Sequence, residues 1–377
     1  MPSRSLSTRD CGSSTTHWIE EGGPRVTTAL REAISKRYGV EEYVCLDAQR
    51  TQWQASRPLD GIRIVDFTPV FRNTLTKYEP LIAAGAELVI GLHPQIPADA
   101  GLVAELSALG LRTATHPTSE DFDLVLDCAG KNADLAANFG HVELTQSGIA
   151  AYKGSLGPVV VVDMSDLKLL ETVFGTGDSY FRALEHLCVP AAEGPVLIFG
   201  GGKVGTGIAY AAQQRSIEPI IVDFPGSGLR FVDTTVVSAT DHDAVKAAIT
   251  RAHTIVTATG KRNSVAQFAE ALTHSNALLA NMGVDDEFGA GVPAERVLHS
   301  KVPVNFVLDE PTLLTYLDPV FALSNAAAVQ LVAGETASGI SAPLSDTEEK
   351  IRATLTQTET HVQELAAITT IAASRRD

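Results

Sequence analysis

The sequence predicts an α/β protein of two domains, each built on a parallel sheet with helices between its strands. Short runs of β-branched residues alternate with segments of helical periodicity along most of the 377 residues. Glycines close two of the helical segments, at Gly85 and Gly110. A chain of this length corresponds to two domains at roughly 100–200 residues each. Its 45% hydrophobic content is ordinary for a globular protein and sufficient for a large core.

The first series of elements precedes residue 170. A polar tail of ~16 residues, which we expect to be mobile, comes before a helix over 24–37. Strands follow at 62–67, 87–90, 123–126 and 159–162, with helices at 74–84 and 100–109 between them. The last of these strands is nearly all valine, as expected for a strand that is buried on both faces.

A long helix over 166–187 marks the boundary to a second α/β series. Its strands are expected at 195–199, 219–222, 254–257, 277–280 and 302–308, with helices at 204–214, 243–251 and 265–272. The C-terminal part is predicted to be helical, first over 325–332 and then over 346–374. The second of these segments is rich in Thr, Ala and Glu, and we expect it to extend from the body of the protein.

The charge and the cysteines limit the partners and the location. A net charge of -16 and a pI near 5.0 argue against nucleic acid and anionic membranes, because an acidic surface repels both. Cys11, Cys45, Cys128 and Cys188 show neither CxxC pairing nor metal-ligand spacing, so no metal site is expected. Free thiols are typical of a reducing cytoplasm, and residues 1–20 lack the apolar region of a signal peptide. We therefore expect a cytoplasmic protein.

The sharpest motif is the run Gly-Gly-Gly-Lys-Val-Gly-Thr-Gly at residues 200–207. It follows a predicted strand and opens a predicted helix, which is the context of a G-x-G-x-x-G dinucleotide-binding turn. Gly200 would permit the tight turn, Gly202 would let the backbone approach a pyrophosphate, and Gly205 would let the helix pack close to the strand. The first turn of the helix would offer free N–H groups to the phosphates. The alternative is a glycine turn that binds no ligand.

A carboxylate closes the next predicted strand. Asp223 lies about 20 residues after the turn, where an acidic side chain accepts hydrogen bonds from the ribose hydroxyls of a dinucleotide. It would repel a 2′-phosphate, and no arginine follows directly in Phe224-Pro225-Gly226. The sequence therefore predicts NAD, rather than NADP, as the cofactor.

Further motifs occur in the same order as in a known family. The Asn281-Met282-Gly283 turn follows a strand, residues 304–306 read Val-Asn-Phe, and Thr145-Gln146-Ser147-Gly148 is followed by Tyr152-Lys153. From about Leu59 to Val332, this order resembles the S-adenosylhomocysteine hydrolase family. Residues 200–207 resemble the family's glycine loop, and residues 281–283 resemble its Asn-Ile-Gly turn. Residues 304–306 resemble its Val-Asn-Leu segment. Residues 145–148 resemble its Thr-Thr-Thr-Gly loop, and residues 126–130 resemble its Leu-Asp-Asp-Gly-Gly turn.

The resemblance implies an α/β substrate-binding domain over 1–170, a Rossmann-type NAD-binding domain over 171–320, and C-terminal helices over 321–377 that return to the first domain. It also implies tightly held NAD and a homo-oligomer, either a dimer or a tetramer. The family's NAD contacts carry over to Thr145, Gln146, Ser147, Thr172, Gly202, Lys203, Val204, Asp223, Met282, Gly283 and Asn305.

The implied reaction begins with oxidation of a sugar hydroxyl by NAD. The resulting ketone acidifies a neighbouring C–H, a base expels a β leaving group, water adds, and the alcohol is restored. The family's two catalytic histidines fall at Pro69 and Val284, its catalytic Asp at Cys128, and its Lys at Leu167, next to Lys168. Because Pro and Val cannot transfer a proton, we expect a changed substrate.

Five residues are candidate catalytic groups: Glu171, Cys128, Lys153, Lys168 and Asp285. For each, a solvated or merely buried side chain is the competing interpretation. The leading hypothesis is an NAD-dependent enzyme that oxidises a hydroxyl of a nucleoside-like substrate and promotes elimination or addition of water or another β-group. Two alternatives remain: an adenosylhomocysteinase with displaced acid–base residues, and a catalytically silent NAD-binding regulatory protein.

Overall fold

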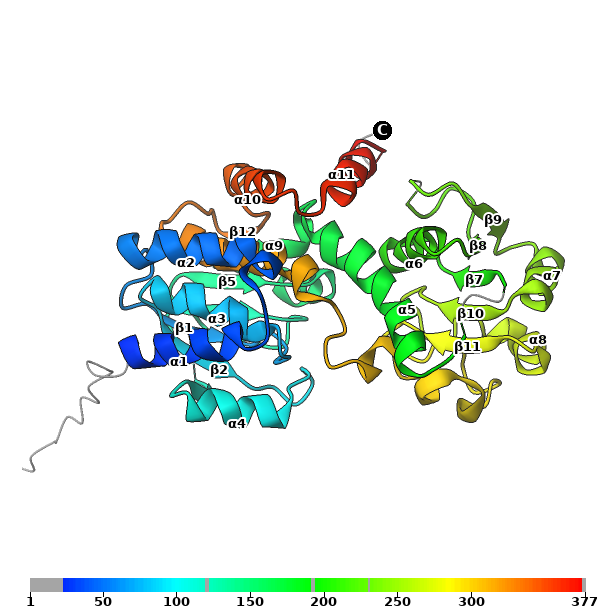
Figure 1. Ribbon diagram of the computed structural model, residues 1–377, viewed down its shortest axis with the longest axis horizontal. Coiled ribbons are helices and arrows are strands. Elements are labelled where there is room, and N and C mark those ends of the chain that lie inside the picture. Colours follow the sequence, from blue (N-terminus) through cyan, green and yellow to red (C-terminus); the bar gives the residue numbers. More distant parts are fainter. Residues whose placement is uncertain (1–22, 119–121, 191–193, 230, 375–377) are drawn as a thin grey trace, which may run out of the picture.

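The computed structural model describes residues 23–118, 122–190, 194–229 and 231–374, so the expected N-terminal tail lies outside the described residues. The elements form two α/β bodies that lie side by side, each with one parallel sheet (Figure 1). The α/β fold class predicted from the sequence is therefore confirmed. No helix in the described ranges has both the length and the apolar character needed to cross a membrane.

The first sheet has seven parallel strands in the order β12-β6-β5-β4-β1-β2-β3. Its strands are β1 (Arg63–Asp66), β2 (Glu87–Gly91), β3 (Arg112–Ala114), β4 (Leu124–Asp127), β5 (Gly140–Glu143), β6 (Pro158–Val161) and β12 (Gly339–Ser341). The strand order reverses between β1 and β4. In open α/β sheets, ligands bind outside the carboxyl ends of the strands at such a switch point.

Six helices pack on this sheet and on one another. They are α1 (Gly23–Ser35), α2 (Val44–Ser56), α3 (Thr74–Ala83), α4 (Ala100–Ala108), α9 (Leu314–Val332) and α10 (Ser345–Gln357). Helix α3 is buried from Thr74 to Leu81, because it packs against α1, α2 and α9. Helix α9 also contacts β4, β5 and β6, so a segment from the end of the chain completes the first core.

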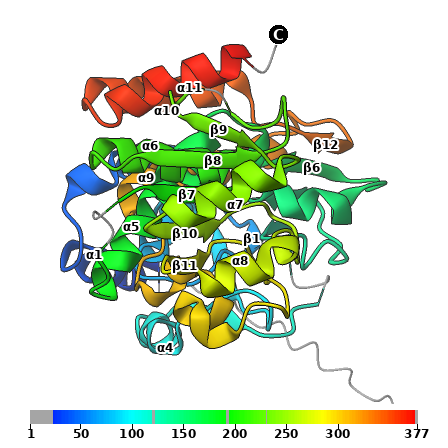
Figure 2. The same cartoon turned by 90° about the vertical axis from the view of Figure 1, so that its right-hand side faces the viewer.

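The second sheet has five parallel strands in the order β11-β10-β7-β8-β9. Its strands are β7 (Val196–Phe199), β8 (Pro219–Asp223), β9 (Thr235–Ser238), β10 (Thr254–Thr257) and β11 (Leu278–Asn281). Helices α5 (Thr176–His186) and α6 (Lys203–Gln214) cover the face toward the first body, and α7 (His242–Arg251) and α8 (Ala269–His274) cover the other (Figures 1 and 2). This is the strand order 3-2-1-4-5 of a Rossmann fold, with its switch point between β7 and β10.

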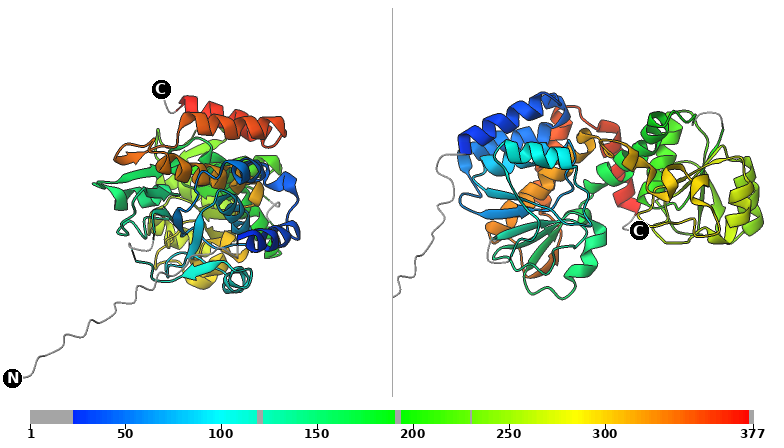
Figure 3. Two further views of the ribbon diagram at one scale, coloured as in Figure 1. Left: turned by 90° about the vertical axis from the view of Figure 1, so that its left-hand side faces the viewer. Right: turned by 90° about the horizontal axis from the view of Figure 1, so that it is seen from below.

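Two segments link the bodies. The helix that precedes α5 is π-helical over η5 (Leu170–Gly175), and α9 leads the chain back to the first body. Helix α11 (Val362–Ser374) contacts η5, so the C-terminal helix reaches the region between the bodies (Figure 3, right). Short 3-10 turns complete the described chain at η1 (Val40–Glu42), η3 (Gln146–Tyr152), η4 (Val162–Met164), η6 (Ala266–Phe268), η7 (Ala294–Arg296), η8 (Leu298–Lys301) and η9 (Val304–Val307). The exact domain boundaries stay a prediction.

The prediction of a strand over 302–308 was wrong. This segment forms the turn η9, in which the N–H of Phe306 donates to the carbonyl of Pro303 at 3.1 Å. The N–H of Leu308 likewise donates to Asn305 at 3.2 Å. Pro303 has no N–H for a strand ladder, and the backbone groups after it bond within the turn instead.

The continuous, outward-projecting helix expected over 346–374 was also wrong. Glu359 and His361 have positive φ angles of 53° and 56° between α10 and α11, which breaks the segment into two helices. Ile351, Leu355 and Ile368 are buried in the core of the first body, so both helices pack on the protein. Ile351 and Leu355 lie four positions apart, so they share one face of α10 and hold it against the core.

Helix α9 begins eleven residues before the predicted start at 325, with Pro319 inside it. A proline leaves the carbonyl four residues earlier without its helical partner. Here that carbonyl belongs to Thr315, and Nε2 of His361 contacts it at 2.7 Å. A side chain from the turn before α11 thus replaces the missing backbone donor.

Asp318 provides a pH-dependent contribution to stability. It is buried in α9 and accepts the N–H groups of Cys45 and Leu46, both at 2.9 Å, at the start of α2. Burial raises the pKa of Asp318 to about 7. The unfolded value is about 3.9, so the folded state binds the proton more tightly. Its contribution is complete below about pH 4 and is lost as the pH rises to about 7.

We therefore expect Asp318→Asn to reduce the loss of stability between about pH 4 and pH 7 by roughly 2–4 kcal/mol. Urea denaturation of both proteins across this range measures the effect. A variant that keeps the full pH dependence of the parent would contradict it.

Candidate functional site

The glycine turn after β7 has the backbone that its sequence predicts. Gly200 has a φ of 100°, a left-handed value that favours glycine. A Cβ on Gly205 would lie 1.8 Å from the carbonyl oxygen of Gly200, so no larger residue fits there. A Cβ on Gly202 would meet nothing within 4 Å, and this residue is exposed at the N-terminus of α6. The turn is thus closed on the sheet side and open at the helix end.

Asp223 lies directly against this turn. Its Oδ2 accepts the N–H of Gly201 at 2.8 Å, and its Oδ1 accepts the N–H of Phe224 at 2.7 Å. The carboxylate is half-buried at the carboxyl end of β8. Glycine turn and carboxylate therefore stand together on neighbouring strands, as the spacing in the sequence predicted.

The other side of this switch point is fixed by a carboxylate that no sequence motif indicated. Glu287 is fully buried and accepts the N–H groups of Thr259 at 2.9 Å and Gly260 at 2.7 Å. Burial raises the pKa of Glu287 above its ordinary value. These bonds hold the loop after β10, which lies beside the glycine turn because β7 and β10 are neighbours.

The predicted cofactor residues Met282, Gly283 and Asn305 are buried near the end of β11 and in η9. Asn281 organises the first of these turns, because its Oδ1 accepts the N–H of Gly283 at 3.0 Å and its Nδ2 donates to the carbonyl of Lys301 at 2.7 Å.

The switch point of the first sheet holds a buried ion pair that the sequence did not reveal. Asp66 ends β1 and Lys77 lies on α3, and Nζ of Lys77 donates to Oδ2 of Asp66 with both side chains fully buried. The other oxygen of Asp66 accepts the N–H of Thr68 at 2.8 Å. Burial lowers the pKa of Lys77. The partners lie 11 positions apart, across the connection from β1 to α3, so no local motif marks the pair.

Cys128 follows β4 and lies within electrostatic reach of several charged groups. These are Lys77, Asp127, Glu143, Lys168 and Glu171. Burial raises the pKa of the Cys128 thiol to about 12, so the thiol is protonated at neutral pH. The structure thus brings three of the five candidate catalytic residues together: Cys128, Lys168 and Glu171.

Lys168 and Glu171 form an ion pair at the start of the helix that links the two bodies. Lys168 is buried, whereas the Glu171 side chain is 20% exposed. Glu171 lies in the π-helical segment η5, and such segments are frequent at functional sites. Thr172, a predicted cofactor residue, donates its hydroxyl to the carbonyl of Lys168 at 3.0 Å.

Glu143 fixes the loops on the other side of Cys128. It is fully buried at the end of β5 and accepts the N–H groups of Ala129 at 3.0 Å, Gly130 at 2.9 Å and Thr145 at 2.7 Å. Burial raises the pKa of Glu143. Ala129 has a φ of 60°, a conformation rare outside glycine that these bonds help to hold.

Asp163 links the loop that begins at Thr145 to the second body. Oδ2 of Asp163 accepts the N–H of Gln146 at 3.1 Å, and its Oδ1 pairs with Nζ of Lys203 from the glycine turn. Ser147 lies 3.1 Å from Thr145, measured between the hydroxyl oxygens. Asp163 therefore connects the predicted cofactor residue Gln146 of the first body to Lys203 of the glycine turn in the second.

Two of the candidate catalytic residues lie apart from this cluster. Lys153 is exposed after η3. Asp285 is exposed and pairs with Arg262. Val204, a predicted cofactor residue, is half-buried in the first turn of α6. Within the described ranges, no group of three or more His, Cys, Asp or Glu side chains is placed to hold a metal ion.

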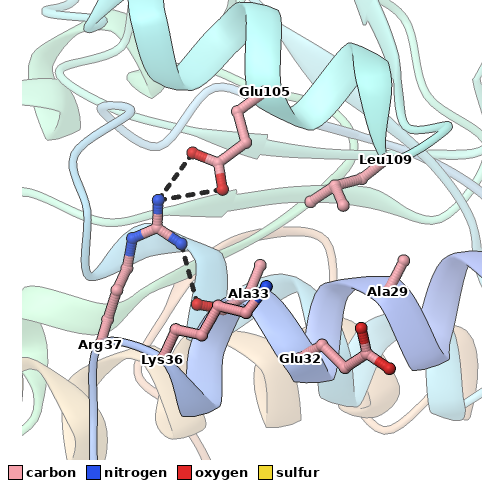
Figure 4. Close-up of a pocket in the computed structure, with 7 residues that line it drawn as sticks. All are labelled: Ala29, Glu32, Ala33, Lys36, Arg37, Glu105 and Leu109. Atoms are coloured by element: carbon pink, nitrogen blue, oxygen red, sulfur yellow. Dashed lines mark hydrogen bonds and ion pairs between the residues drawn. The ribbon is translucent and has the colours of Figure 1, made fainter.

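A surface groove of about 440 Å³ lies between α1 and α4 (Figure 4). The ion pair of Arg37 and Glu105, with an N–O distance of 2.7 Å, crosses it. The groove contains none of the residues at either switch point, so we do not assign it to the candidate site.

The comparisons with known proteins concern the fold alone. No family model matches the sequence, and no curated protein matches it. The chain is similar to a dipicolinate synthase subunit from Bacillus halodurans, with 10% identity over 73% of this chain and 99% of that one, and a TM-score of 0.45. The chain is also similar to a transhydrogenase from Sinorhizobium meliloti, with 13% identity over 73% of this chain and 96% of that one, and a TM-score of 0.42. The TT0316 protein from Thermus thermophilus is 11% identical over 62% of this chain and 76% of that one, with a TM-score of 0.34.

Proposed function

We propose that this chain is an NAD-dependent enzyme that acts on a hydroxyl of a small nucleoside-like molecule held between the two sheets. One observation carries the proposal. In the second sheet, the glycine turn follows the strand at the switch point, and Asp223 ends the neighbouring strand. This arrangement binds the pyrophosphate and the adenosine ribose of a dinucleotide in Rossmann folds.

The residues present fit such a cofactor in three respects. Gly202 is exposed and has open space around its Cα, so backbone can approach a pyrophosphate there. The N–H groups at the start of α6, from Lys203 and Val204, have no partners inside the helix and would donate to phosphate oxygens. The carboxylate of Asp223 would accept the ribose hydroxyls and disfavour a 2′-phosphate, which supports NAD over NADP.

Bound NAD would supply the hydride acceptor for oxidation of a hydroxyl. We assign the accompanying proton to Glu171, which is partly exposed and carries a carboxylate that Lys168 orients. The protonated thiol of Cys128 would donate a hydrogen bond to the substrate rather than attack it. Glu143 would act at one remove, by holding the loops at Ala129 and Thr145.

The later steps rest on the resemblance to the S-adenosylhomocysteine hydrolase family. Removal of a proton next to the new carbonyl, loss or addition of water or another β-group, and return of the hydride to the carbonyl would complete the reaction. The positions of the family's catalytic histidines carry Pro69 and Val284, and the side chain of Val284 is exposed. This supports a substrate other than S-adenosylhomocysteine. A homo-oligomeric state is part of the same proposal.

Mass spectrometry of small molecules released from denatured protein tests the cofactor, and we expect NAD. The second step is to incubate the protein with a panel of nucleosides and follow the near-ultraviolet absorbance of reduced nicotinamide. An increase with one nucleoside supports the proposal. Release of a thiol from S-adenosylhomocysteine would instead support an adenosylhomocysteinase. Bound NAD that no substrate reduces would support a silent regulatory protein, which the loss of both histidines favours.

With a substrate in hand, Glu171→Gln is expected to lower kcat by ~10²–10⁴-fold, because the amide cannot accept the proton. The NAD content should be unchanged, since the substitution leaves the glycine turn intact. Glu185→Gln, on the exposed side of α5, is the matched control and should keep full activity. A Glu171→Gln variant with a normal kcat would remove this residue from the mechanism.

A further inference from the structure

An ion pair joins the two bodies beside the pyrophosphate end of the proposed cofactor site. Lys203 is the first residue of α6, and its ammonium pairs with Oδ1 of Asp163, which follows β6 of the first sheet. The Asp163 side chain is only 5% exposed, and the Lys203 side chain is 27% exposed. The contact therefore joins the two bodies at the open end of the glycine turn.

A lysine at this position is electrostatically unusual. The N-terminus of a helix carries a partial positive charge, so a cation in its first turn is unfavourable unless an anion lies nearby. In this structure, Asp163 supplies that anion. A pyrophosphate at Gly202 would bring negative charge to the same point, and Lys203 could then pair with the phosphates instead.

Asp163 has few alternatives if it loses this partner. Its second oxygen accepts the N–H of Gln146 at 3.1 Å, and no other cation pairs with it among the described residues. A nearly buried carboxylate without a counterion is unfavourable. When Lys203 leaves Asp163 to pair with the cofactor, the free energy lost at Asp163 therefore weakens cofactor binding.

We infer that Asp163 limits the affinity for the cofactor by competing with its pyrophosphate for Lys203. The inference rests on the proposed function and adds a regulatory element to the same site. Under this inference, removing the Asp163 charge should tighten cofactor binding, which a simple positioning role does not predict. If Asp163 merely held Lys203 in place for the phosphates, the same change would weaken binding.

The test is calorimetric titration of NAD into the full chain and three variants, after removal of any bound nucleotide. Asp163→Asn should lower the Kd for NAD by about tenfold, in the usual range for coupling between sites. Lys203→Met should raise it by about tenfold. In the Lys203→Met background, Asp163→Asn should change the Kd less than about twofold, since the competition is for Lys203.

Asp178→Asn is the matched control, because it removes one negative charge from an ion-paired aspartate of the second body. Its Kd should stay within about twofold of the parent, because Asp178 pairs with Arg182 and Arg215 and not with Lys203. Melting curves without cofactor check that each variant is folded. If Asp163→Asn binds NAD as tightly as the parent or more weakly, the inference is wrong but the proposed function stands. The same holds if the effects of Asp163→Asn and Lys203→Met on the Kd are additive in the double variant. Absence of NAD binding by the parent and every variant overturns the proposed function with it.

Discussion

Replacing Lys77 with methionine is expected to lower the free energy of unfolding by about 3–5 kcal/mol, because the change leaves the Asp66 charge buried without its partner. Both side chains are fully buried, and α3 is enclosed by α1, α2 and α9. The remaining bond to Asp66, from the N–H of Thr68, cannot replace an ammonium. Urea denaturation at neutral pH measures the loss.

Two further variants separate the buried charge from simple loss of packing. In the double variant Lys77→Met and Asp66→Leu, no charge is left, so most of the lost stability should return. Arg251→Met removes a pair with Glu218 that is more than half exposed on both sides, and we expect a change below about 1 kcal/mol. A loss of similar size for Lys77→Met would show that the buried pair contributes little.

Alanine at Gly202 and alanine at Gly205 are expected to have different consequences, although both residues belong to one turn. At Gly202 the new Cβ meets nothing in the free protein, so the melting temperature should not change. The same Cβ would stand where the backbone approaches the pyrophosphate, and the NAD affinity should fall at least about tenfold, or about 1.4 kcal/mol.

At Gly205 the new Cβ would lie 1.8 Å from the carbonyl oxygen of Gly200, so the turn itself must move. We expect a loss of about 1–3 kcal/mol in stability together with loss of NAD binding. Gly157→Ala is the control, because its Cβ also has open space but lies outside both switch points. If Gly202→Ala bound NAD as tightly as the parent protein, the cofactor could not approach the turn as proposed.

The fold was largely predictable because its central strands are strongly apolar. β7 reads Val-Leu-Ile-Phe and is buried throughout, and the valines of β6 are buried as well. The strands that escaped prediction lack this signal: β3, β9 and β12 lie at sheet edges or are only partly buried, and β5 contains His141 and Glu143. Their pairing depends on tertiary context more than on local sequence.

The positions of the glycine turn and Asp223 were predictable for a related reason. A glycine turn and Asp223 come from adjacent elements, so their spacing along the chain reflects their spacing in the fold. The rest of the site has no such motif. Asp66 and Lys77 lie only 11 positions apart, but no local pattern marks a buried ion pair, and Glu143 and Glu287 bind backbone groups that no sequence pattern identifies. The sequence therefore indicated the turn and the candidates Cys128, Lys168 and Glu171, but not the Asp66–Lys77 pair or the backbone bonds of Glu143 and Glu287.

We propose above all that the glycine turn and Asp223 together bind a dinucleotide. A crystal structure of the protein grown with excess NAD examines this directly. We predict a pyrophosphate against the backbone of Gly202 and Lys203, with the adenosine ribose hydroxyls bonded to the Asp223 carboxylate. A turn that stays empty under saturating NAD, with Asp223 bonded only to Gly201 and Phe224, would contradict the account.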